Sequence, residues 1–160
     1  MTIAVGDKIP DVKVQLPGLN GPEAAQTGDL LGKGTAVLFG LPGAFTPTCS
    51  DYHLPGFVAR ADDLRAKGVD TIACVSVNDA FVMKAWGELN HVNDQVLLIA
   101  DGSATFTKTL GLDIDLTGGG LGVRSKRYAM ILKDGVVTDL VVEETLGLDV
   151  SSADAVLARL

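Results

Sequence analysis

At 160 residues the chain is long enough to bury a core of its own, and a composition of 47% hydrophobic and 21% charged residues excludes a disordered protein. The net charge of −7, with few and scattered basic residues, excludes the concentrated positive surface that nucleic-acid binding requires. The apolar runs are too short to cross a membrane and residues 1–7 lack the features of a secretory signal, so we expect a soluble, cytoplasmic protein with a single domain over residues 1–160.

The first half of the chain predicts two strands and a long helical segment. Residues 12–16 alternate between apolar and polar, as in a short strand, and turn residues follow over 17–22. The unbroken apolar run 35–41 indicates a strand that is buried on both faces. A helical pattern then extends over 48–67, and Pro55 is expected to kink or interrupt it.

The middle of the chain continues the alternation of strands and helices. A buried strand is predicted over 69–77 and another over 96–100. Between them, Asp79 is expected to cap a helix that ends near residue 89. The inward face of that helix is predicted to carry Phe81, Val82, Ala85, Trp86 and Leu89. A short helix should occupy 101–110.

The last part of the chain predicts a loop, a hairpin and a helix. The glycine-rich residues 111–122 indicate a flexible loop. Residues 127–142 read as a β-hairpin with an Asp-Gly turn, and Ser151 and Ser152 should cap a final short helix.

Together these elements indicate an α/β fold with a central mixed β-sheet flanked by helices and an N-terminal β extension. A β-α-β half followed by β-β-α is the thioredoxin-like arrangement. In such sheets the chemistry lies at the carboxyl ends of strands, where helices begin.

Cys49 lies at such a position, just after the strand 35–41 and at the expected start of a helix. The unpaired N–H groups of a helix N-terminus favour the thiolate form of a cysteine, which is the reactive form. Thr46 can supply a hydroxyl three residues earlier, and Pro42 and Pro47 stiffen the approach. The alternative is an ordinary buried thiol, since free cysteine is often buried.

The segment around Cys49 resembles a known family. Pro42-x-x-x-Thr46-x-x-Cys49 is similar to the peroxiredoxin signature, and the longer run Pro-Gly-Ala-Phe-Thr-Pro-Thr-Cys-Ser with His53-Leu-Pro-Gly-Phe resembles the type II, peroxiredoxin-five-like branch. This resemblance covers nearly the whole chain. It implies a thiol peroxidase in which Cys49 is the peroxidatic cysteine and forms a sulfenic acid.

The resemblance also implies roles for three further residues. Thr46 and the Cys49 backbone N–H would hold the peroxide, and Arg127 would hydrogen-bond both the sulfur and the peroxide. Pro42 would shield the sulfur from water. No metal, haem, flavin or other cofactor is implied. Without the resemblance, the better interpretation of Arg127 is a surface arginine that caps a strand.

Cys74 is the only other cysteine, and it lies in the apolar strand 69–77. It is either a core thiol or a resolving cysteine that condenses with oxidised Cys49, which requires the two Cα atoms to approach within roughly 7 Å. Members of the family with this cysteine pair are typically recycled by glutaredoxin and glutathione or by thioredoxin. The type II resemblance further implies a homodimer.

The remaining histidines, cysteines and aromatic residues allow functions other than a peroxidase. His53 lies four residues after Cys49, and a Cys–His pair for acyl transfer is conceivable, but no orienting partner is visible, so His53 reads as a structural or tuning residue. The spacing of the two cysteines and two histidines is not that of a zinc site. Phe45 reads as a core or dimer-contact residue that could also serve an alkyl peroxide. A redox sensor that passes oxidation to a partner protein is the alternative function.

Overall fold

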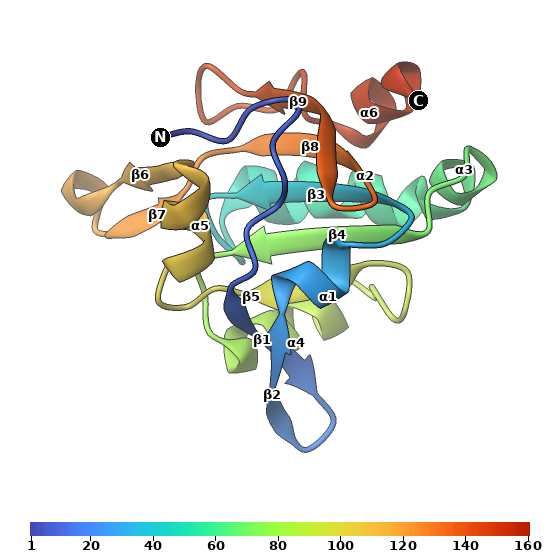
Figure 1. Ribbon diagram of the computed structural model, residues 1–160. Coiled ribbons are helices and arrows are strands. Elements are labelled where there is room, and N and C mark those ends of the chain that lie inside the picture. Colours follow the sequence, from blue (N-terminus) through green and yellow to red (C-terminus); the bar gives the residue numbers. More distant parts are fainter.

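A seven-stranded sheet runs through the computed structural model, which describes residues 1–160 (Figure 1). Its strands are β1 (Lys13–Gly18), β2 (Gly21–Gln26), β3 (Thr35–Leu41), β4 (Thr71–Ser76), β5 (Leu97–Ala100), β8 (Tyr128–Lys133) and β9 (Val136–Val142). They are ordered β2-β1-β5-β4-β3-β8-β9, with β3, β4 and β5 parallel and the remaining pairs antiparallel. A separate small sheet pairs β6 (Asp113–Asp115) with β7 (Val123–Ser125).

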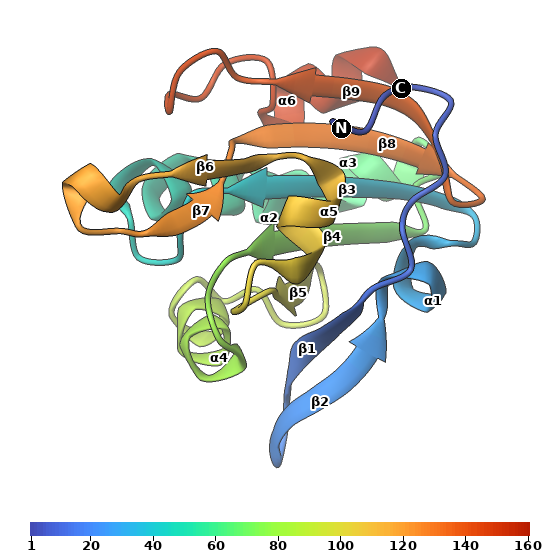
Figure 2. The same cartoon turned by 60° about the vertical axis from the view of Figure 1, so that its left-hand side comes forward.

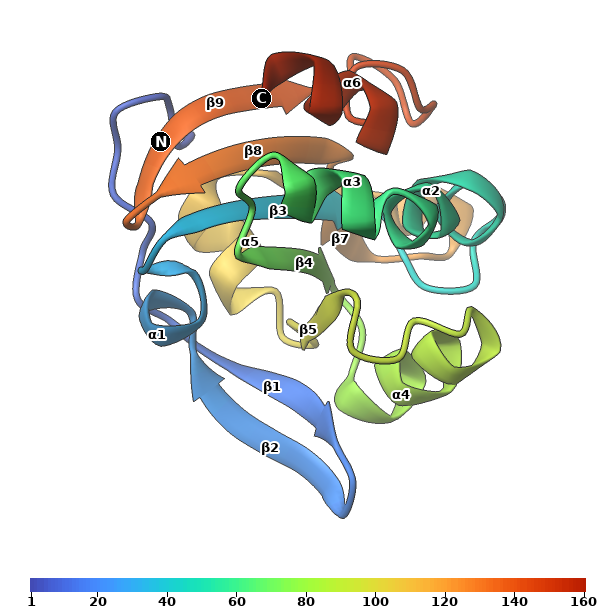
Figure 3. The same ribbon diagram turned by 90° about the vertical axis from the view of Figure 1, so that its right-hand side faces the viewer.

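Helices cover both faces of the main sheet. They are α1 (Thr27–Leu31), the π-helical turn η1 (Cys49–His53), α2 (Leu54–Ala59), α3 (Ala61–Ala66), α4 (Ala80–Leu89), α5 (Thr105–Leu110), the 3₁₀ turn η2 (Thr117–Gly119) and α6 (Ala153–Arg159). Figure 3 shows α2, α3, α4 and α6 on one face, and α1 and α5 lie on the other. None of the helices has the length and apolarity needed to span a membrane.

The central strand β3 is buried on both faces because its side chains alternate between two cores. Val37 and Phe39 belong to the core under α2, α3 and α4, whereas Ala36 and Leu38 belong to the core under α1 and α5. This confirms the prediction made from the unbroken apolar run. Burying apolar side chains on both faces of one strand fixes its position in the sheet.

The sheet register brings two distant segments together. β3 and β8 run antiparallel with Gly40 opposite Tyr128, so the residues just before β8 lie beside the residues just after β3. The Ala44 N–H, beyond the end of β3, donates to Asn78 Oδ1 beyond the end of the parallel strand β4 (3.0 Å). The carboxyl ends of these strands therefore meet the start of β8 at one edge.

Several sequence predictions are confirmed. The mixed sheet flanked by helices is present, and the β1–β2 hairpin forms the N-terminal extension, which projects from the body in Figure 2. The β8–β9 hairpin turns at Asp134 and Gly135, both with positive φ, as a two-residue Asp-Gly turn requires. Ser152 caps α6 by accepting the Ala155 N–H.

The helical segment after β3, which Pro55 was expected to kink or interrupt, is interrupted, but not at Pro55. It consists of η1, α2 and α3, and Pro55 lies where the π-helical turn η1 passes directly into α2, since His53 and Leu54 both have helical backbone angles. The break falls later, at Arg60, whose backbone leaves the helical region.

Two further predictions fail, the first of them in part. In α4 the predicted inward residue Trp86 is buried and Val82 is partly buried, but Phe81, Ala85 and Leu89 are exposed, and Ala80, Met83 and Gly87 are buried instead. The Asp79 cap sets the phase of this helix, and Ala80, Met83 and Gly87 share the face that meets the sheet. The expected loop 111–122 is largely ordered as β6, η2 and the turn before β7.

Gly40 offers a test of the β3–β8 register. A Cβ on Gly40 would lie 2.2 Å from Tyr128 Cε1, so Gly40→Ala should lower the free energy of unfolding by about 1–3 kcal/mol or more. Urea unfolding followed by circular dichroism measures this. Gly118→Ala is the control, because nothing lies within 4 Å of its Cβ position, and it should change stability by less than about 0.5 kcal/mol. Equal stability of both variants would contradict the packing described.

Candidate active site

The segment after β3 turns sharply into a helix that begins at Pro47. Within η1 the Leu54 N–H donates to Cys49 O, one residue further than in an α-helix. Cys49 and His53 are both buried on the inner side of this turn, since residues four apart lie on the same face of a helix. The neighbouring Ser50 is anchored from α4, because Trp86 Nε1 donates to its Oγ (2.9 Å).

Arg127, just before β8, is the centre of the site. Its Nη2 donates to Cys49 Sγ (3.1 Å), its Nη1 donates to His53 Nδ1 (2.8 Å), and its Nε donates to Leu146 O (3.1 Å). The side chain is 3% exposed. Each of the three guanidinium nitrogens thus donates to an acceptor, and these bonds fix the orientation of the group toward the sulfur. A charge-assisted donor of this kind stabilises a thiolate more than a thiol.

His53 is neutral in this setting. Burial first, and the Arg127 charge second, lower its pKa from 6.5 to about 3. Because Nδ1 accepts from Arg127, the proton is on Nε2, which donates to Ser151 O (3.0 Å). The ring packs against Phe39 and Phe57, which stack on each other at a centroid distance of 3.9 Å. His53 therefore supplies Arg127 with an uncharged acceptor.

The loop 143–151 supplies backbone acceptors to Arg127 and His53. Glu143 accepts hydrogen bonds from the N–H groups of residues 149–151 and from the Ser151 hydroxyl. Burial alone would raise the pKa of Glu143, but the Ser151 hydroxyl and these backbone groups lower it overall. A carboxylate at this position folds the loop back, so that Leu146 O and Ser151 O point at Arg127 and His53.

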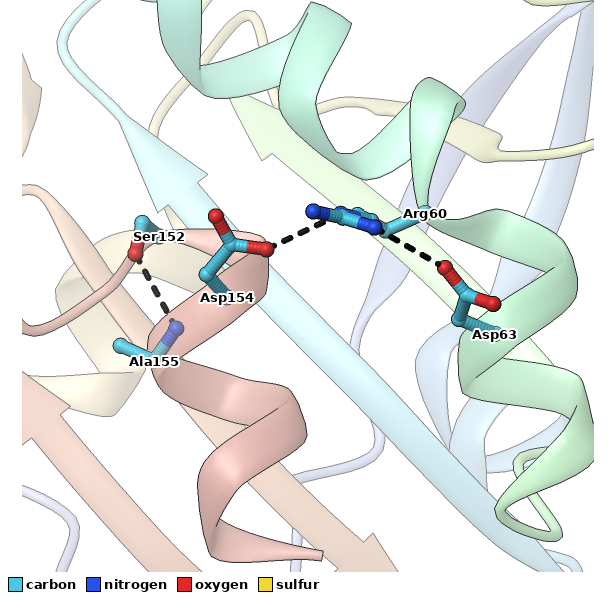
Figure 4. A network of polar contacts seen from close by, with 5 residues as sticks. All are labelled: Arg60, Asp63, Ser152, Asp154 and Ala155. Atoms are coloured by element: carbon cyan, nitrogen blue, oxygen red, sulfur yellow. Dashed lines mark hydrogen bonds and ion pairs between the residues drawn. The ribbon is translucent and has the colours of Figure 1, made fainter.

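The helix after this loop is tied to the helices near the cysteine (Figure 4). Arg60, at the α2–α3 junction, forms ion pairs with Asp63 and with Asp154 of α6. Both pairs are well exposed, so their contribution is small. The packing of buried Val156 in the core shared with Phe57 adds to this attachment.

Thr46 and Pro42 lie in the same turn but contact other groups than the sulfur. The Thr46 hydroxyl donates to Gly43 O (2.7 Å), which leaves its lone pairs free. Pro42 is buried, and its carbonyl accepts from Arg124 (3.1 Å). The Cys49 N–H makes no hydrogen bond, so a free donor remains beside the sulfur. Phe45 is half exposed in a left-handed conformation (φ 66°), which contradicts a core position but not the alternatives of a dimer contact or a site for an alkyl peroxide.

Cys74 is fully buried in β4, opposite Phe39, and belongs to the same apolar core as Cys49. Burial raises the pKa of the Cys74 thiol well above its usual range, and the Cys49 sulfur raises it further, while Arg127 lowers it. The two sulfurs are not bonded to each other. Cys74 is thus a protonated core thiol in this conformation.

The structure also bears on the zinc site and on the Cys–His pair considered from the sequence. No three His, Cys, Asp or Glu side chains are grouped as for a metal ion, and His91 is exposed in a loop. His53 has a cation and a carbonyl as its partners, which do not make it a base for Cys49.

Sequence reasoning missed Glu143 and Leu146 and read Ser151 only as a helix cap. Two of these three act on the site through backbone carbonyls, which any residue supplies, so they leave no side-chain signal. An acidic residue directly after an apolar strand, with two serines eight and nine residues later, was the available hint of the closed loop.

Comparison with known proteins adds independent findings. The Redoxin family matches residues 4–157. Among curated proteins, the chain is 51% identical to Peroxiredoxin-2E-2, chloroplastic, of Oryza sativa subsp. japonica, covering 99% of this chain and 73% of the relative. It is 49% identical to Peroxiredoxin-2B of Arabidopsis thaliana, covering 99% and 98%. These names agree with the type II resemblance.

Among solved structures, the chain is similar to reduced Prx3 of Vibrio vulnificus in complex with H₂O₂. The TM-score is 0.92 with 51% sequence identity, and 99% of each chain is covered. The thioredoxin-like fold expected from the order of elements is thereby confirmed.

The neutral His53 predicts a specific loss of stability in acid. The unfolded state binds a proton at this histidine below about pH 6.5, whereas the folded state does so only near pH 3. The free energy of unfolding should therefore fall with decreasing pH through this window, by up to about 1.4 kcal/mol per pH unit from this residue. Urea unfolding at pH 7, 6 and 5 measures the slope.

His53→Gln should flatten that slope between pH 6 and 5, while His91→Asn should leave it unchanged, because His91 is exposed and Asn tolerates its positive φ. The same slope in His53→Gln as in the unmodified protein would show that another group is responsible.

Proposed function

The chain belongs to the Redoxin family and, within it, to the peroxiredoxins, which are thiol-dependent peroxidases, and from this premise we propose that Cys49 is the residue that reduces hydrogen peroxide and small organic hydroperoxides. The single observation that carries the proposal is the Arg127 Nη2 donor 3.1 Å from a buried Cys49 Sγ. A guanidinium held in place by two further acceptors cannot turn away from the sulfur.

The proposed step is a displacement at oxygen. The Cys49 thiolate attacks the outer oxygen of the hydroperoxide, an S–O bond forms and the O–O bond breaks. Cys49 becomes a sulfenic acid, and the leaving oxygen takes up a proton to become water or an alcohol. Charge moves from sulfur to the leaving oxygen, and a cation next to both positions stabilises the transition state.

The surrounding groups fit this step. The free Cys49 N–H can donate to a peroxide oxygen, and the Thr46 hydroxyl, which donates its own hydrogen bond to Gly43 O, can accept a hydrogen bond from the peroxide O–H. Buried Pro42 forms part of the dry wall of the turn. Neutral His53 holds Arg127 without competing with the sulfur for its charge. We assign these residues supporting roles in the same reaction.

The sulfenic acid must be reduced by a thiol, which we propose comes from outside the chain, from glutaredoxin and glutathione or from thioredoxin. The burial and raised pKa of Cys74 support this, because a protonated core thiol is a poor nucleophile toward oxidised Cys49. Two unpaired cysteines also suit a reducing compartment such as the cytoplasm.

We also propose that two copies of the chain form a homodimer through the surface around Phe45 and Phe81. Phe45 is exposed in the turn after β3 and Phe81 in the first turn of α4, and the bond between Ala44 N–H and Asn78 joins the two segments. Exposed aromatic residues are enriched at protein interfaces. The Phe45 backbone is strained by its left-handed conformation, and contacts with a partner surface would offset the cost of that strain.

The peroxidase proposal is tested by peroxide consumption with a thiol donor. Cys49→Ser should abolish turnover, since no other residue offers a thiolate beside Arg127. Cys74→Ser, the matched control, should retain turnover with glutaredoxin and glutathione. Mass spectrometry after one equivalent of peroxide should find the added oxygen on Cys49. Undiminished consumption by Cys49→Ser would refute the proposal, and inactive but folded Cys74→Ser would make Cys74 an obligatory resolving cysteine.

The dimer proposal is tested by sedimentation equilibrium. Phe81→Ser should weaken self-association by roughly tenfold or more, because it removes a large aromatic contact from the centre of the surface. Leu19→Ser is the control, since Leu19 is also apolar and is even more exposed than Phe81, but lies at the tip of the β1–β2 hairpin. A monomeric unmodified protein, or equal effects of both variants, would contradict this interface.

A further inference from the structure

A second arginine, Arg124 of β7, reaches the turn that precedes Cys49 without touching the sulfur. Its Nη1 donates to Pro42 O (3.1 Å) and its Nε donates to Leu121 O (2.9 Å). A Cβ added to Gly43 would lie 2.3 Å from Nη1, so the guanidinium lies directly against the Gly43 backbone. Arg124 takes part in no ion pair, and its polar contacts are both with carbonyls.

The peptide that Arg124 holds is connected to Thr46. Gly43 O accepts both the Thr46 hydroxyl (2.7 Å) and the Thr46 N–H (3.3 Å). A shift of the Pro42–Gly43 peptide would therefore move the Thr46 hydroxyl with it. The position of that hydroxyl relative to Cys49 depends on where Arg124 keeps the peptide.

Arg124 and Arg127 belong to one short segment. Arg124 is fixed in the small sheet opposite Ile114, Ser125 between them is fully buried, and Arg127 follows at the start of β8. One end of the Pro42–Cys49 turn is thus held by Arg124 and the other end by Arg127. If residues 124–127 move as a unit, the contact of Arg124 with Pro42 O and the contact of Arg127 with Cys49 Sγ shift together. The distance between these two contacts then stays constant.

We propose that Arg124 is a positioning residue for peroxide reduction, which sets the Thr46 hydroxyl at the correct place opposite Arg127 and Cys49. The proposal rests on the peroxidase function proposed above. The polar contacts of Arg124 are with the Leu121 and Pro42 carbonyls and not with the sulfur, so it acts on the reaction through Pro42, Gly43 and Thr46. Gly43 has no room for a side chain because the Arg124 guanidinium of β7 lies against it, so Gly43 is the place where β7 meets the turn before Cys49.

The test separates positioning from general reactivity of the sulfur. Arg124→Ala should slow the single-turnover reaction of Cys49 with hydrogen peroxide by between about tenfold and a hundredfold, because a misplaced Thr46 no longer holds the O–O bond. Alkylation of Cys49 by iodoacetamide needs no such group and should change by less than about twofold. Stopped-flow fluorescence can follow the peroxide reaction, since the sole tryptophan, Trp86, is bonded to Ser50 beside Cys49.

Three further variants test the proposed connection. Arg124→Lys should restore part of the rate, because a Lys ammonium can still donate to Pro42 O. Gly43→Ala should expel the guanidinium and reproduce the slow peroxide reaction, and Arg124→Ala with Gly43→Ala should be no slower than either alone. Arg65→Ala is the matched control, because Arg65 makes the same kind of bond, to Gln95 O (2.8 Å), away from the site, and it should react like the unmodified protein.

Each outcome decides the matter. An unchanged peroxide rate in Arg124→Ala, or a drop in alkylation as large as the drop in peroxide rate, would overturn the positioning role. Additive losses in the double variant would overturn the route through Gly43. If the unmodified protein itself failed to react with peroxide, the proposed function would be wrong, which is a different result from normal reaction in Arg124→Ala.

Discussion

The contact between the Arg127 guanidinium and the Cys49 sulfur is the constraint on which the rest of this structure depends. A guanidinium that is 3% exposed has lost most of its hydration, and it is stable there only if its donors have acceptors. The sulfur is one acceptor, and the fold supplies the others from a helix and from a late loop. Much of the architecture around the site can be understood as a set of acceptors for one cation.

The choice of a histidine as one acceptor has an electrostatic consequence. A carboxylate in place of His53 would bind Arg127 more strongly, but its negative charge would offset the cation that the sulfur faces. A neutral ring leaves that charge available. The acidic residue of this region, Glu143, is instead bound to backbone amides of its own loop, where it shapes the chain and does not pair with Arg127. His53 thus leaves the positive charge of Arg127 available to the sulfur, while Glu143 determines the fold of the loop 143–151.

The sequence was informative where local pattern and fold coincide. The apolar run of β3, the position of Cys49 after it and the Asp-Gly turn each follow from residues close in the chain, and they were predicted. The π-helical turn could not be seen, because five residues are too few to distinguish its period from that of an α-helix. In α4 the apolar residues occur around the whole helix, so the pattern did not reveal which face is buried, and Phe81 was misplaced. The contacts of Arg127 with carbonyls of the loop 143–151 leave no trace in side-chain chemistry.

The late position of that loop bears on how the protein is made. During synthesis the ribosome delivers Cys49 long before Leu146 and Ser151, whose carbonyls complete the surroundings of Arg127 and His53. A nascent chain that ends at β9 contains Cys49, His53 and Arg127 but lacks the Leu146 carbonyl that accepts from Arg127 and the Ser151 carbonyl that accepts from His53. The surroundings of the cysteine are therefore complete only after residues 146–151 have been added and have folded back onto Arg127 and His53.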